Sequence, residues 1–388
     1  MGKGVAVLGL LTALLFLLTV AGCIHTAAAM VCLALYGRRP DAMATSFPVV
    51  TVLKPLYGDE PRLLENLSSF LEQDYSGPAE FIFGVSDPTD PAIATVTALK
   101  ARYPDAAIRL VVDPRQHGTN AKVSNLINMS RDMAGDVVIV ADSDMVVEPD
   151  YLTRVVGALQ RPGVGGVTCL YRGISLPNIW SRLATGWVDG NFLPNVVLGM
   201  TIGLAKPCFG STIATTRHNL GWLGGFTGLK NKLADDYEFG QAIRSLDSAV
   251  AVPARPVLGH TSAVFDLPGL LRQEVRWART IRTVDPAGFA GSVVTHVLPF
   301  ALLNVLFSLF SLTSLVMLLL ALGLRIGLNL QVKAFVRKDT ADLSLLPLRD
   351  LLSFAVFFLS FWPGSIEWRG HRFGVRSDGV MTAQDTTG

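Results

Sequence analysis

The sequence has few charged side chains for its length. Lys, Arg, Asp and Glu make up only 16% of the 388 residues, whereas 50% are hydrophobic, and the mean hydropathy is +0.42. Soluble globular domains carry roughly 25% charged residues. The 33 basic and 31 acidic residues nearly cancel to a net charge of +2, which does not indicate a nucleic-acid partner. The composition therefore predicts a protein that is partly embedded in a membrane.

Cysteine is scarce, and two common phosphate-binding loops are missing. The four cysteines form no C-x-x-C pair, and Cys23 and Cys32 fall inside an apolar run. They read as buried thiols in a reducing compartment, and a zinc site is not expected. No G-x-G-x-x-G follows the first predicted strand, and no G-x-x-x-x-G-K-S/T occurs. A bound nucleotide must therefore be held differently than in Rossmann dehydrogenases or P-loop NTPases.

Residues 5–35 form an apolar run longer than the roughly 20 residues that a membrane-spanning helix needs. The alternative, a cleaved signal peptide, has an apolar region of only roughly 7 to 15 residues. Arg38 and Arg39 follow the run, so the positive-inside rule places the next domain in the cytoplasm and the short N-terminus outside. We expect a transmembrane anchor over residues 1–40.

Two further apolar runs lie near the other end of the chain. Residues 297–324 predict a second span. Residues 351–362 are short for a span, so they form either an interfacial or re-entrant helix, or part of a span that extends back through Arg349 and Asp350. We therefore expect one globular domain over residues 41–290 and a C-terminal membrane region with a cytoplasmic tail over 291–388.

Strands and helices alternate in the predicted globular domain. Strands are expected at 49–53, 79–87, 107–114 and 136–144, separated by amphipathic helical segments, one of which covers 92–103. This alternation predicts an α/β fold with a mostly parallel, Rossmann-like sheet. The strands are continuous apolar runs, as is typical of strands buried on both faces.

Carboxylates gather where these strands end, which is where open α/β sheets bind ligands. Asp142 and Asp144 are separated by one serine at the end of the fourth strand. Such a D-x-D can present oxygens to Mg²⁺ or Mn²⁺, and the cation can also bind a diphosphate. Alternatively the pair only solvates a loop, and Asp150 caps the following helix.

An arginine-rich helix is expected over residues 270–283. Its four arginines, Arg272, Arg276, Arg279 and Arg282, share one face beside an apolar stripe formed by Leu271, Val275, Ala278 and Ile281. Such a helix can lie on anionic lipid headgroups. Arginine also binds phosphate through its planar fork, and Trp277 can stack on a ring, so the same helix could clamp a diphosphate.

Four motifs together carry a resemblance to a known family. Asp87, the D-x-D pair, the Asp235–Asp236 pair and Gln273-x-x-Arg276-Trp277 follow the order of the D, D-x-D, D, Q-x-x-R-W signature. Over residues 50–283 the chain resembles membrane glycosyltransferases with a GT-A domain. More narrowly it is similar to the ceramide glucosyltransferase family and its bacterial, hopanoid-associated relatives, through "LKPLYGDEP", "VSDPTDPA", "NAKVSNL" and "LADDYEFG".

The resemblance implies a role for each acidic motif. Asp87 and Lys122 would bind the donor nucleotide, although Asp87 could instead be a turn residue before Pro88 and Lys122 a solvated helix residue. Asp144 would be the principal metal ligand, and Asp142 would assist at the metal and help to orient the diphosphate or ribose. Asp236 would be the general base that takes the acceptor's proton, with Asp235 as the competing candidate.

Further roles are implied for the remaining motifs. Arg276 and Trp277 would close over the diphosphate and the acceptor end, with Gln273 contributing less. Residues 206–217 would line the donor-sugar pocket, where Gly210 permits close backbone approach, or would be simply a buried strand. His260 is either a further metal ligand or a hydrogen-bonded structural histidine.

The resemblance thus implies inverting transfer of one glucose or N-acetylglucosamine from a UDP-sugar to the hydroxyl of a membrane lipid, with Mg²⁺ or Mn²⁺ as cofactor. The expected acceptor is a ceramide or a hopanoid, at the cytoplasmic face of a bacterial inner membrane. Vertebrate-type members carry a small residue after the "DS" pair, whereas this chain has Asp144 there. That difference favours metal dependence and weakens the transfer of donor specificity. A processive polysaccharide synthase, or a transporter or scaffold with a degenerate nucleotide domain, are the alternatives.

Overall fold

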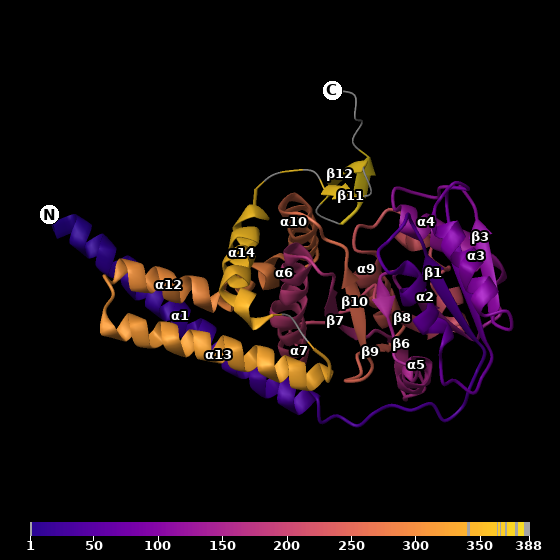
Figure 1. Cartoon of the computed structure of the whole chain (residues 1–388), viewed down its shortest axis with the longest axis horizontal. Coiled ribbons are helices and arrows are strands. Elements are labelled where there is room, and N and C mark those ends of the chain that lie inside the picture. The colour runs from indigo at the N-terminus through magenta and orange to yellow at the C-terminus, as the bar shows by residue number, and fades with distance from the viewer. Residues whose placement is uncertain are drawn as a thin grey trace. The chain divides into compact units, whose positions relative to one another are not determined.

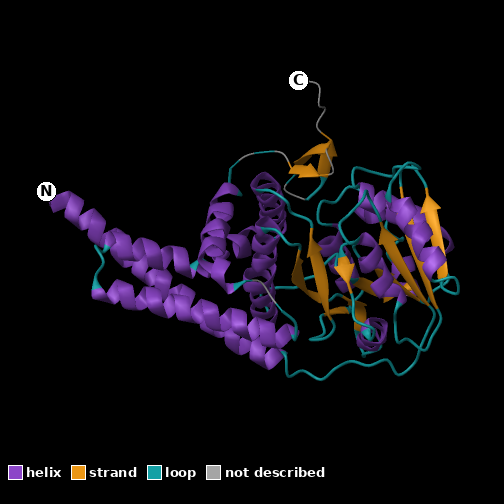
Figure 2. Cartoon of the chain, viewed as in Figure 1, coloured by secondary structure: helices purple, strands orange, loops and turns teal. Residues whose placement is uncertain are grey.

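The computed structural model describes residues 2–339, 342–362, 364, 366–368, 371–376 and 379–383. The chain folds into two compact units (Figures 1 and 2). The helical unit consists of residues 1–38, 175–205 and 264–364. The other unit consists of residues 39–174, 206–263 and 365–388, and it is named the catalytic unit because it holds the predicted acidic motifs. Both units are assembled from separated segments, unlike the three consecutive segments predicted. Residues 175–205 and 264–290, predicted within the globular domain, belong to the helical unit.

The catalytic unit is built on a seven-stranded sheet with the order β3-β2-β1-β4-β8-β6-β9. The first four strands in chain order are parallel: β1 (Val50–Pro55), β2 (Ala79–Val85), β3 (Ala107–Val112) and β4 (Val137–Val140). The strand β8 (Ile213–Thr216) is antiparallel to both of its neighbours, β4 and β6 (Val164–Val167), and β6 pairs in parallel with β9 (Ala249–Ala251). The predicted α/β fold with a mostly parallel sheet is confirmed.

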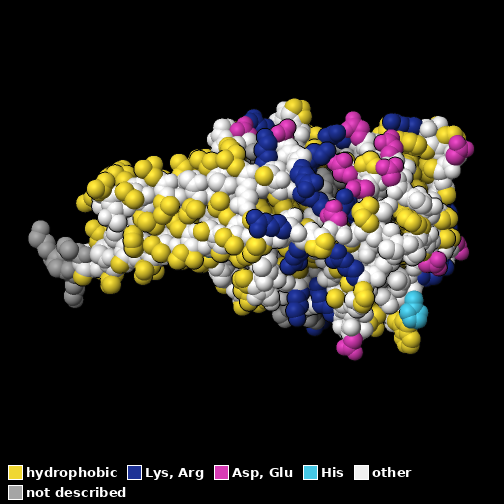
Figure 3. All heavy atoms as spheres, turned by 90° about the horizontal axis from the view of Figure 1, so that it is seen from below, with side chains coloured by type: hydrophobic (Ala, Val, Ile, Leu, Met, Phe, Trp, Pro, Cys, Tyr) yellow, Lys and Arg dark blue, Asp and Glu magenta, His cyan; other side chains and the backbone are white. Residues whose placement is uncertain are grey.

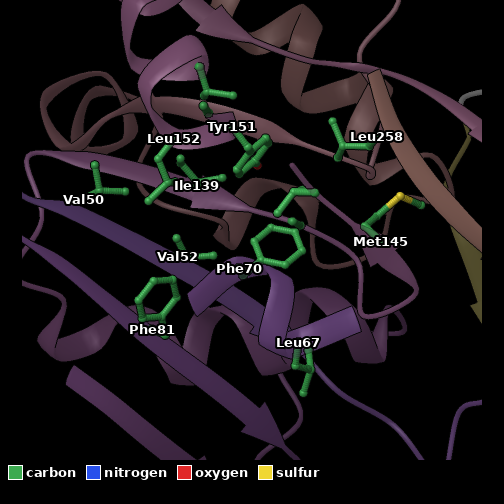
Figure 4. Packing of buried hydrophobic residues seen from close by; sticks show 14 of the residues in the cluster. Val50, Val52, Leu67, Phe70, Phe81, Ile139, Met145, Tyr151, Leu152 and Leu258 are labelled. Atoms are coloured by element: carbon green, nitrogen blue, oxygen red, sulfur yellow. The ribbon is translucent and has the colours of Figure 1, made fainter. Parts of the chain in front are cut away.

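Alternating side chains on these strands pack into two separate hydrophobic cores, one on each face of the sheet. Val50 and Val52 of β1 pack on one face of the sheet, whereas Leu53 packs on the other. Successive strand residues point to opposite faces, so an uninterrupted apolar strand needs a helical layer on each side. The first face is covered by α2 (Leu63–Leu71), α3 (Ala92–Arg102) and α5 (Tyr151–Leu159), as Figure 4 shows for Leu67, Phe70, Tyr151 and Leu152. The second is covered by α4 (Ala121–Met129), α8 (Arg217–Trp222) and α9 (Asp235–Arg244).

A second, three-stranded sheet has the order β5-β10-β7. The strand β5 (Met145–Val146) follows Asp144 directly and pairs antiparallel with β10 (Val257–Ser262), while β7 (Leu170–Ser175) lies on the far side of β10. In this register His260 lies opposite Met145. The pairing therefore connects β10 to the end of the turn formed by residues 142–144, the D-S-D turn. The small strands β11 (Ile366–Trp368), β12 (His371–Val375) and β13 (Met381–Ala383) form a third sheet.

The candidate membrane segments of the helical unit are in the helices α1 (Gly2–Tyr36), α12 (Val297–Phe307) and α13 (Leu312–Val336). Among the described residues, two stretches, Ala6–Tyr36 and Leu312–Val336, are long and apolar enough to cross a membrane. A bent pair, Pro286–Thr295 with Val297–Phe307, would make a third if it counts as one span. Hydrophobic side chains cover the part of this unit that holds α1, α12 and α13 (Figure 3). A surface of this kind matches the predicted anchor.

The prediction of one span over residues 297–324 is wrong, because the chain reverses between α12 and α13. Leu309 and Phe310 have positive φ angles of 49° and 58° and form the turn. The hydroxyl of Ser311 then caps α13 by accepting a hydrogen bond from the amide of Ser314, at 3.3 Å. Because the turn residues are themselves apolar, hydropathy runs through the turn without a break.

Helices α1 and α13 run in the same direction. Gly37 at the end of α1 lies against Phe335 near the end of α13, and the side-chain amide of Gln331 donates to the carbonyl of Met30, at 2.7 Å. Earlier in both helices, Cys23 and Ala321 share one apolar cluster. Contacts in the order 23, 30, 37 against 321, 331, 335 establish the parallel pairing.

The helical unit has further helices besides the 3₁₀ turns η4 (Ser292–Thr295) and η5 (Leu343–Leu345). They comprise α6 (Ile179–Trp187), the π-helix η2 (Val188–Phe192), α7 (Leu193–Thr201), α10 (Leu267–Val284), α11 (Pro286–Gly291) and α14 (Leu346–Leu359). The short apolar run predicted at 351–362 falls largely in α14, whose 14 residues are fewer than a span needs. Arg349 and Asp350, predicted to be costly in a membrane, are buried in this unit.

Candidate active site

The D-S-D turn directs its two carboxylates to different partners. The amide of Asp142 donates to the carbonyl of Gly210, at 3.1 Å, and the carbonyl of Asp144 accepts from the amide of Thr261, at 2.9 Å. With its backbone held from both sides, the turn places the Asp142 carboxylate beside Lys122 and the Asp144 carboxylate beside His260. The two like charges are therefore each matched by a separate basic side chain.

Lys122 joins two of the predicted acidic motifs. Its Nζ lies 2.7 Å from Oδ1 of Asp142 and 3.5 Å from Oδ2 of Asp235. The lysine is in the first turn of α4, which Asn120 caps by accepting from the amide of Val123, at 3.0 Å. Burial would lower the pKa of Lys122, but Asp142, Asp235 and Asp236 outweigh it and raise that pKa. The alternative of a solvated helix residue is wrong, since the side chain is only 11% exposed.

Gly210 links the D-S-D turn to Asp236. While its carbonyl accepts from Asp142, its amide donates to Oδ2 of Asp236, at 2.9 Å. A β-carbon on Gly210 would lie only 2.6 Å from Oδ2 of Asp142 and 3.1 Å from Nζ of Lys122. The missing side chain of Gly210 thus makes room for the Asp142–Lys122 pair, and its role in a donor-sugar pocket stays a prediction.

The neighbours Asp235 and Asp236 have different environments. Asp235 accepts from the side-chain amide of Asn120, at 3.3 Å, and faces Lys122, so its carboxylate joins α9 to α4. Asp236 accepts hydrogen bonds from two backbone amides, that of Gly210 at 2.9 Å and that of Tyr237 at 2.7 Å. Burial and the nearby Asp235 charge raise the pKa of Asp236 to about 6. A carboxylate with a raised pKa is suited to take up a proton near neutral pH.

Asp144 offers an oxygen that could bind a cation. Its Oδ2 lies 3.1 Å from Nε2 of His260, whereas its Oδ1 is buried with no hydrogen-bond partner in the part of the chain that the structure describes. Burial disfavours the charged form of Asp144, but His260, Lys54 and Lys122 outweigh it and lower the pKa. A buried, ionised and unsatisfied carboxylate oxygen is the type of ligand that Mg²⁺ and Mn²⁺ take. Among the described residues no group of three or more His, Cys, Asp or Glu gathers as a complete metal site, so further ligands would have to come from a bound diphosphate and water.

Lys54 lies beneath this turn and was not anticipated. It is the fifth residue of β1, fully buried, and its Nζ donates to the carbonyl of Asp142, at 2.8 Å. The ammonium also lies 3.4 Å from the centre of the Phe70 ring. Burial lowers the pKa of Lys54 to about 7, against the opposing effect of Asp144 and Asp142. The sequence does contain a signal for this role, because Lys54 in "LKPLYGDEP" is a charged residue within an apolar strand.

Asp87 follows β2 at the same edge of the sheet but forms a turn. Its Oδ1 accepts from both the amide and the hydroxyl of Thr89, each at 2.7 Å. The buried carboxylate of this loop is Asp90, which accepts from the amides of Gly58 and Ala92. The turn reading of Asp87 therefore describes its geometry, and its contact with a donor stays a prediction.

The alternative interpretation, in which Asp150 caps the helix after the D-x-D, is only partly confirmed. The helix α5 does begin at Tyr151, but Asp150 makes no side-chain capping bond. Its carboxylate instead pairs with Arg154, at 2.6 Å. The expectation of an Asp150 cap is wrong, because the arginine one turn later competes for the carboxylate.

Gln273, Arg276 and Trp277 lie together on α10 of the helical unit. The ring of Trp277 stacks near that of Trp187 of α6, with centroids 5.3 Å apart and planes inclined by 32°. The buried face of α10 carries Leu270, Glu274 and Ala278. The predicted apolar stripe holds for Leu271, Val275 and Ala278, which pack in one apolar cluster, but not for Ile281, which is 39% exposed.

Apart from Asp87, which forms a local turn with Thr89, the predicted site residues fall into two groups. Lys122, Asp142, Asp144 and Asp236 are brought together in the catalytic unit, and Gln273, Arg276 and Trp277 in the helical unit. A family model described as glycosyl transferase family 21 matches residues 14–381, which covers both groups and nearly the whole chain.

The chain belongs to glycosyl transferase family 21.

Curated relatives agree with this assignment. The chain is similar to ceramide glucosyltransferase 3 of Caenorhabditis elegans, with 24% identity over 356 residues, which are 87% of this chain and 75% of that protein. It is also similar to ceramide glucosyltransferase 1 of the same organism, with 25% identity over 233 residues, 56% of this chain and 47% of that protein. An N-acetylglucosaminyltransferase of Rhizobium leguminosarum bv. viciae is 26% identical over 141 residues, 36% of this chain and 32% of that protein. The chain thus spans less than half of one worm enzyme and three quarters of the other.

The fold of this family 21 glycosyltransferase has a solved counterpart. The mannosyltransferase PcManGT from Pyrobaculum calidifontis, in complex with GDP-Man and Mn²⁺, superposes with a TM-score of 0.54. The match is 22% identical and covers 89% of this chain and 99% of that one. The sheet described above is therefore the mixed α/β sheet of a GT-A glycosyltransferase, as predicted.

Proposed function

We propose that this family 21 glycosyltransferase transfers one hexose, glucose or N-acetylglucosamine, from a UDP-sugar to the hydroxyl of a membrane lipid such as a ceramide or a hopanoid. The observation that carries the proposal is the bridge through Gly210, which holds the Asp142–Lys122 pair next to the Asp236 carboxylate. It joins a phosphate-binding and metal-binding set of side chains to a base. The glucosyl- and N-acetylglucosaminyltransferase relatives support the two candidate sugars.

The donor's diphosphate would bind at the D-S-D turn. Lys122 would supply a fixed positive charge there, and Asp144 would offer Mg²⁺ or Mn²⁺ its Oδ1, which has no hydrogen-bond partner among the described residues. When bound, the cation neutralises the diphosphate and so makes UDP a better leaving group. The Mn²⁺ in the structure of PcManGT supports a divalent cation in this fold. Asp142 would keep Lys122 in place, and Asp87 would contact the uridine.

Asp236 would act as the general base. A single displacement that inverts the anomeric carbon needs a base to remove the proton of the attacking hydroxyl. Asp236 meets this need because its raised pKa makes proton uptake favourable, while the amides of Gly210 and Tyr237 fix its position. Arg276 and Trp277 would act on the departing diphosphate and the acceptor.

We also propose that the protein is a multi-pass membrane protein with its catalytic unit in the cytoplasm. The parallel direction of α1 and α13 supports this, because two parallel spans require the chain between them to return across the membrane. The bent pair ending in α12 supplies that return segment. With Arg38 and Arg39 on the cytoplasmic side, the α12–α13 turn would face outward.

An assay with defined substrates tests the proposal. Purified protein in nanodiscs is incubated with UDP-glucose or UDP-N-acetylglucosamine, Mn²⁺ or Mg²⁺, and either ceramide or bacteriohopanetetrol. We expect UDP release and a product one hexose heavier than the acceptor by mass spectrometry. No UDP release from folded protein with any pairing would refute the proposal, and a ladder of products would indicate a processive synthase instead.

A further inference from the structure

The helix that carries Gln273, Arg276 and Trp277 is held by a buried ion pair. Glu274 of α10 accepts from both terminal nitrogens of Arg349 of α14, each at 2.7 Å. Both side chains are 2% exposed. Arg349 also donates to the carbonyl of Leu183 on α6, at 3.1 Å, and to the hydroxyl of Ser353, at 3.2 Å. One guanidinium thus connects α10, α14 and α6.

The next residue on α14 makes a second buried pair with a different element. Asp350 accepts from Arg325 of α13, at 2.6 and 2.8 Å. Arg325 in turn donates to the carbonyl of Gly190, at 2.8 Å, and to the side chain of Asn191, at 3.1 Å. Gly190 and Asn191 belong to the π-helix η2, a conformation that persists only where its surroundings favour it. Arg349 and Asp350 therefore reach in two directions from one turn of α14.

Both connections end at the same aromatic cluster. Trp187 is the last residue of α6, immediately before η2, and its ring lies 5.3 Å from that of Trp277 and 5.7 Å from that of Phe192. The Glu274–Arg349 pair holds the helix that bears Trp277, and the Asp350–Arg325 pair holds the π-helix that ends in Phe192. The cluster is therefore held from both sides by buried ion pairs.

Two buried ion pairs are not expected to contribute much to the free energy of folding. Desolvation of each charge offsets much of the attraction, and apolar side chains of similar volume often stabilise a fold as well or better. Bidentate pairs do fix direction, because two parallel hydrogen bonds form only when the planar guanidinium and the carboxylate lie edge to edge in nearly one plane. Ionisable groups buried among apolar helices are accordingly expected to have a functional role.

We infer that Arg349 and Asp350 act together as a clamp, in which Arg349 holds α10 and Asp350 holds η2 through Arg325. The clamp sets the rotation of α10 about its axis and the orientation of Trp277 against Trp187. Glu274 and Arg349 are therefore positioning residues for the Gln273-x-x-Arg276-Trp277 motif. The consequence for catalysis rests on the proposed function; the consequence for the geometry of the two tryptophans does not. Trp187 is then part of the surface that Trp277 presents to substrate.

The decisive variant removes both charges of the α10 pair. Glu274→Leu with Arg349→Met keeps a filled interior and leaves no unpaired buried charge, so the protein is expected to fold. The single variant Glu274→Gln, which removes only the negative charge of the pair, is measured beside the double variant. The control is Arg182→Gln, which breaks the ion pair between Arg182 of α6 and Asp342, a pair that is half-exposed and does not involve α10.

Two readouts separate positioning from stability. The first is the circular dichroism of the coupled indoles, assigned by difference against Trp187→Phe. The second is UDP release, analysed as kcat and KM. In the double variant we expect an unchanged melting temperature, a diminished tryptophan couplet and a kcat lower by about 10²-fold, as for a misplaced catalytic group. The KM for the UDP-sugar should change little, because the proposed donor-binding residues are in the catalytic unit.

Each outcome decides between the possibilities. A folded double variant with wild-type couplet and wild-type kcat overturns the clamp. A loss shared equally by Arg182→Gln would make it a general effect of weakened packing, which also overturns it. If the wild type releases no UDP with any donor, the proposed function fails, and the couplet alone still tests the clamp.

Discussion

The Nζ of Lys54 donates a 2.8 Å hydrogen bond to the carbonyl of Asp142, so a fully buried ammonium supports the D-S-D turn from below. The same ammonium lies 3.4 Å from the centre of the Phe70 ring, which packs in the core between β1 and α2. The position of the two site carboxylates is thus coupled to the hydrophobic core through one lysine.

The variant Lys54→Met should lose activity without losing stability. Methionine fills the space and removes a buried charge, so the melting temperature should be unchanged or higher. The turn loses its support, and kcat/KM should fall by about 10–100-fold, as for residues that orient a metal ligand. Thermal unfolding and UDP release measure the two effects, with Lys100→Met on the exposed face of α3 as the control. A loss of stability that matches the loss of activity would contradict this role.

Alanine at Gly210 should disturb Asp142 specifically. The added β-carbon would lie 2.6 Å from Oδ2 of Asp142, so the carboxylate must move away from Lys122. We expect kcat to fall on the order of 10²-fold, because a shift of about 1 Å at a catalytic group has such an effect. The matched control is Gly221→Ala in α8, where nothing lies within 4 Å of the added carbon. Equal activity of the two variants would show that the carboxylate position is not critical.

The pH dependence of the rate should report Asp236. Its pKa is raised to about 6, and only the ionised form can accept a proton, so kcat should fall about tenfold per pH unit below about 6. Because this pKa is above the unfolded value, the group's own contribution to folding stability increases as the pH falls through 6. The acid loss should therefore appear before unfolding, which circular dichroism at each pH verifies. Asp236→Asn should give a low and flat profile; an unchanged acid limb would assign it to another group.

Much of this arrangement follows from the sequence. Continuous apolar strands predicted the parallel sheet, and the strand ends placed Asp142 and Asp144 correctly at its carboxyl edge. The association of His260 with Asp144 did not follow, because it depends on the long-range pairing of β10 with β5. Likewise the partners of Arg349 and Asp350 lie on α10 and α13, and no local pattern specifies such a pairing. The α12–α13 turn was missed because Leu309 and Phe310 are apolar yet adopt positive φ angles.

The two carboxylates of the D-S-D turn should differ in their effect on metal binding. Asp144→Asn removes the charge from the buried oxygen that has no hydrogen-bond partner among the described residues, so Mn²⁺ affinity in the presence of UDP should fall on the order of 10²-fold. Asp142→Asn should mainly weaken UDP binding, because it releases Lys122. Electron paramagnetic resonance of Mn²⁺ and UDP titration distinguish the two. Equal loss of Mn²⁺ binding in both variants would mean that the two carboxylates share the cation.

The membrane topology makes a prediction that needs no substrate. If the bent pair crosses the membrane, the turn between α12 and α13 lies on the side opposite to the proposed cytoplasmic side, since α1 and α13 are parallel. An epitope inserted between Leu309 and Phe310 should then bind antibody on intact spheroplasts. The same epitope inserted beside the exposed Asp59 of the catalytic unit should bind only after permeabilisation. An Asp59 epitope accessible from outside would reverse the orientation. A turn epitope that requires permeabilisation while Asp59 also does would instead place α12 and α13 in a hairpin that enters and leaves on the cytoplasmic side.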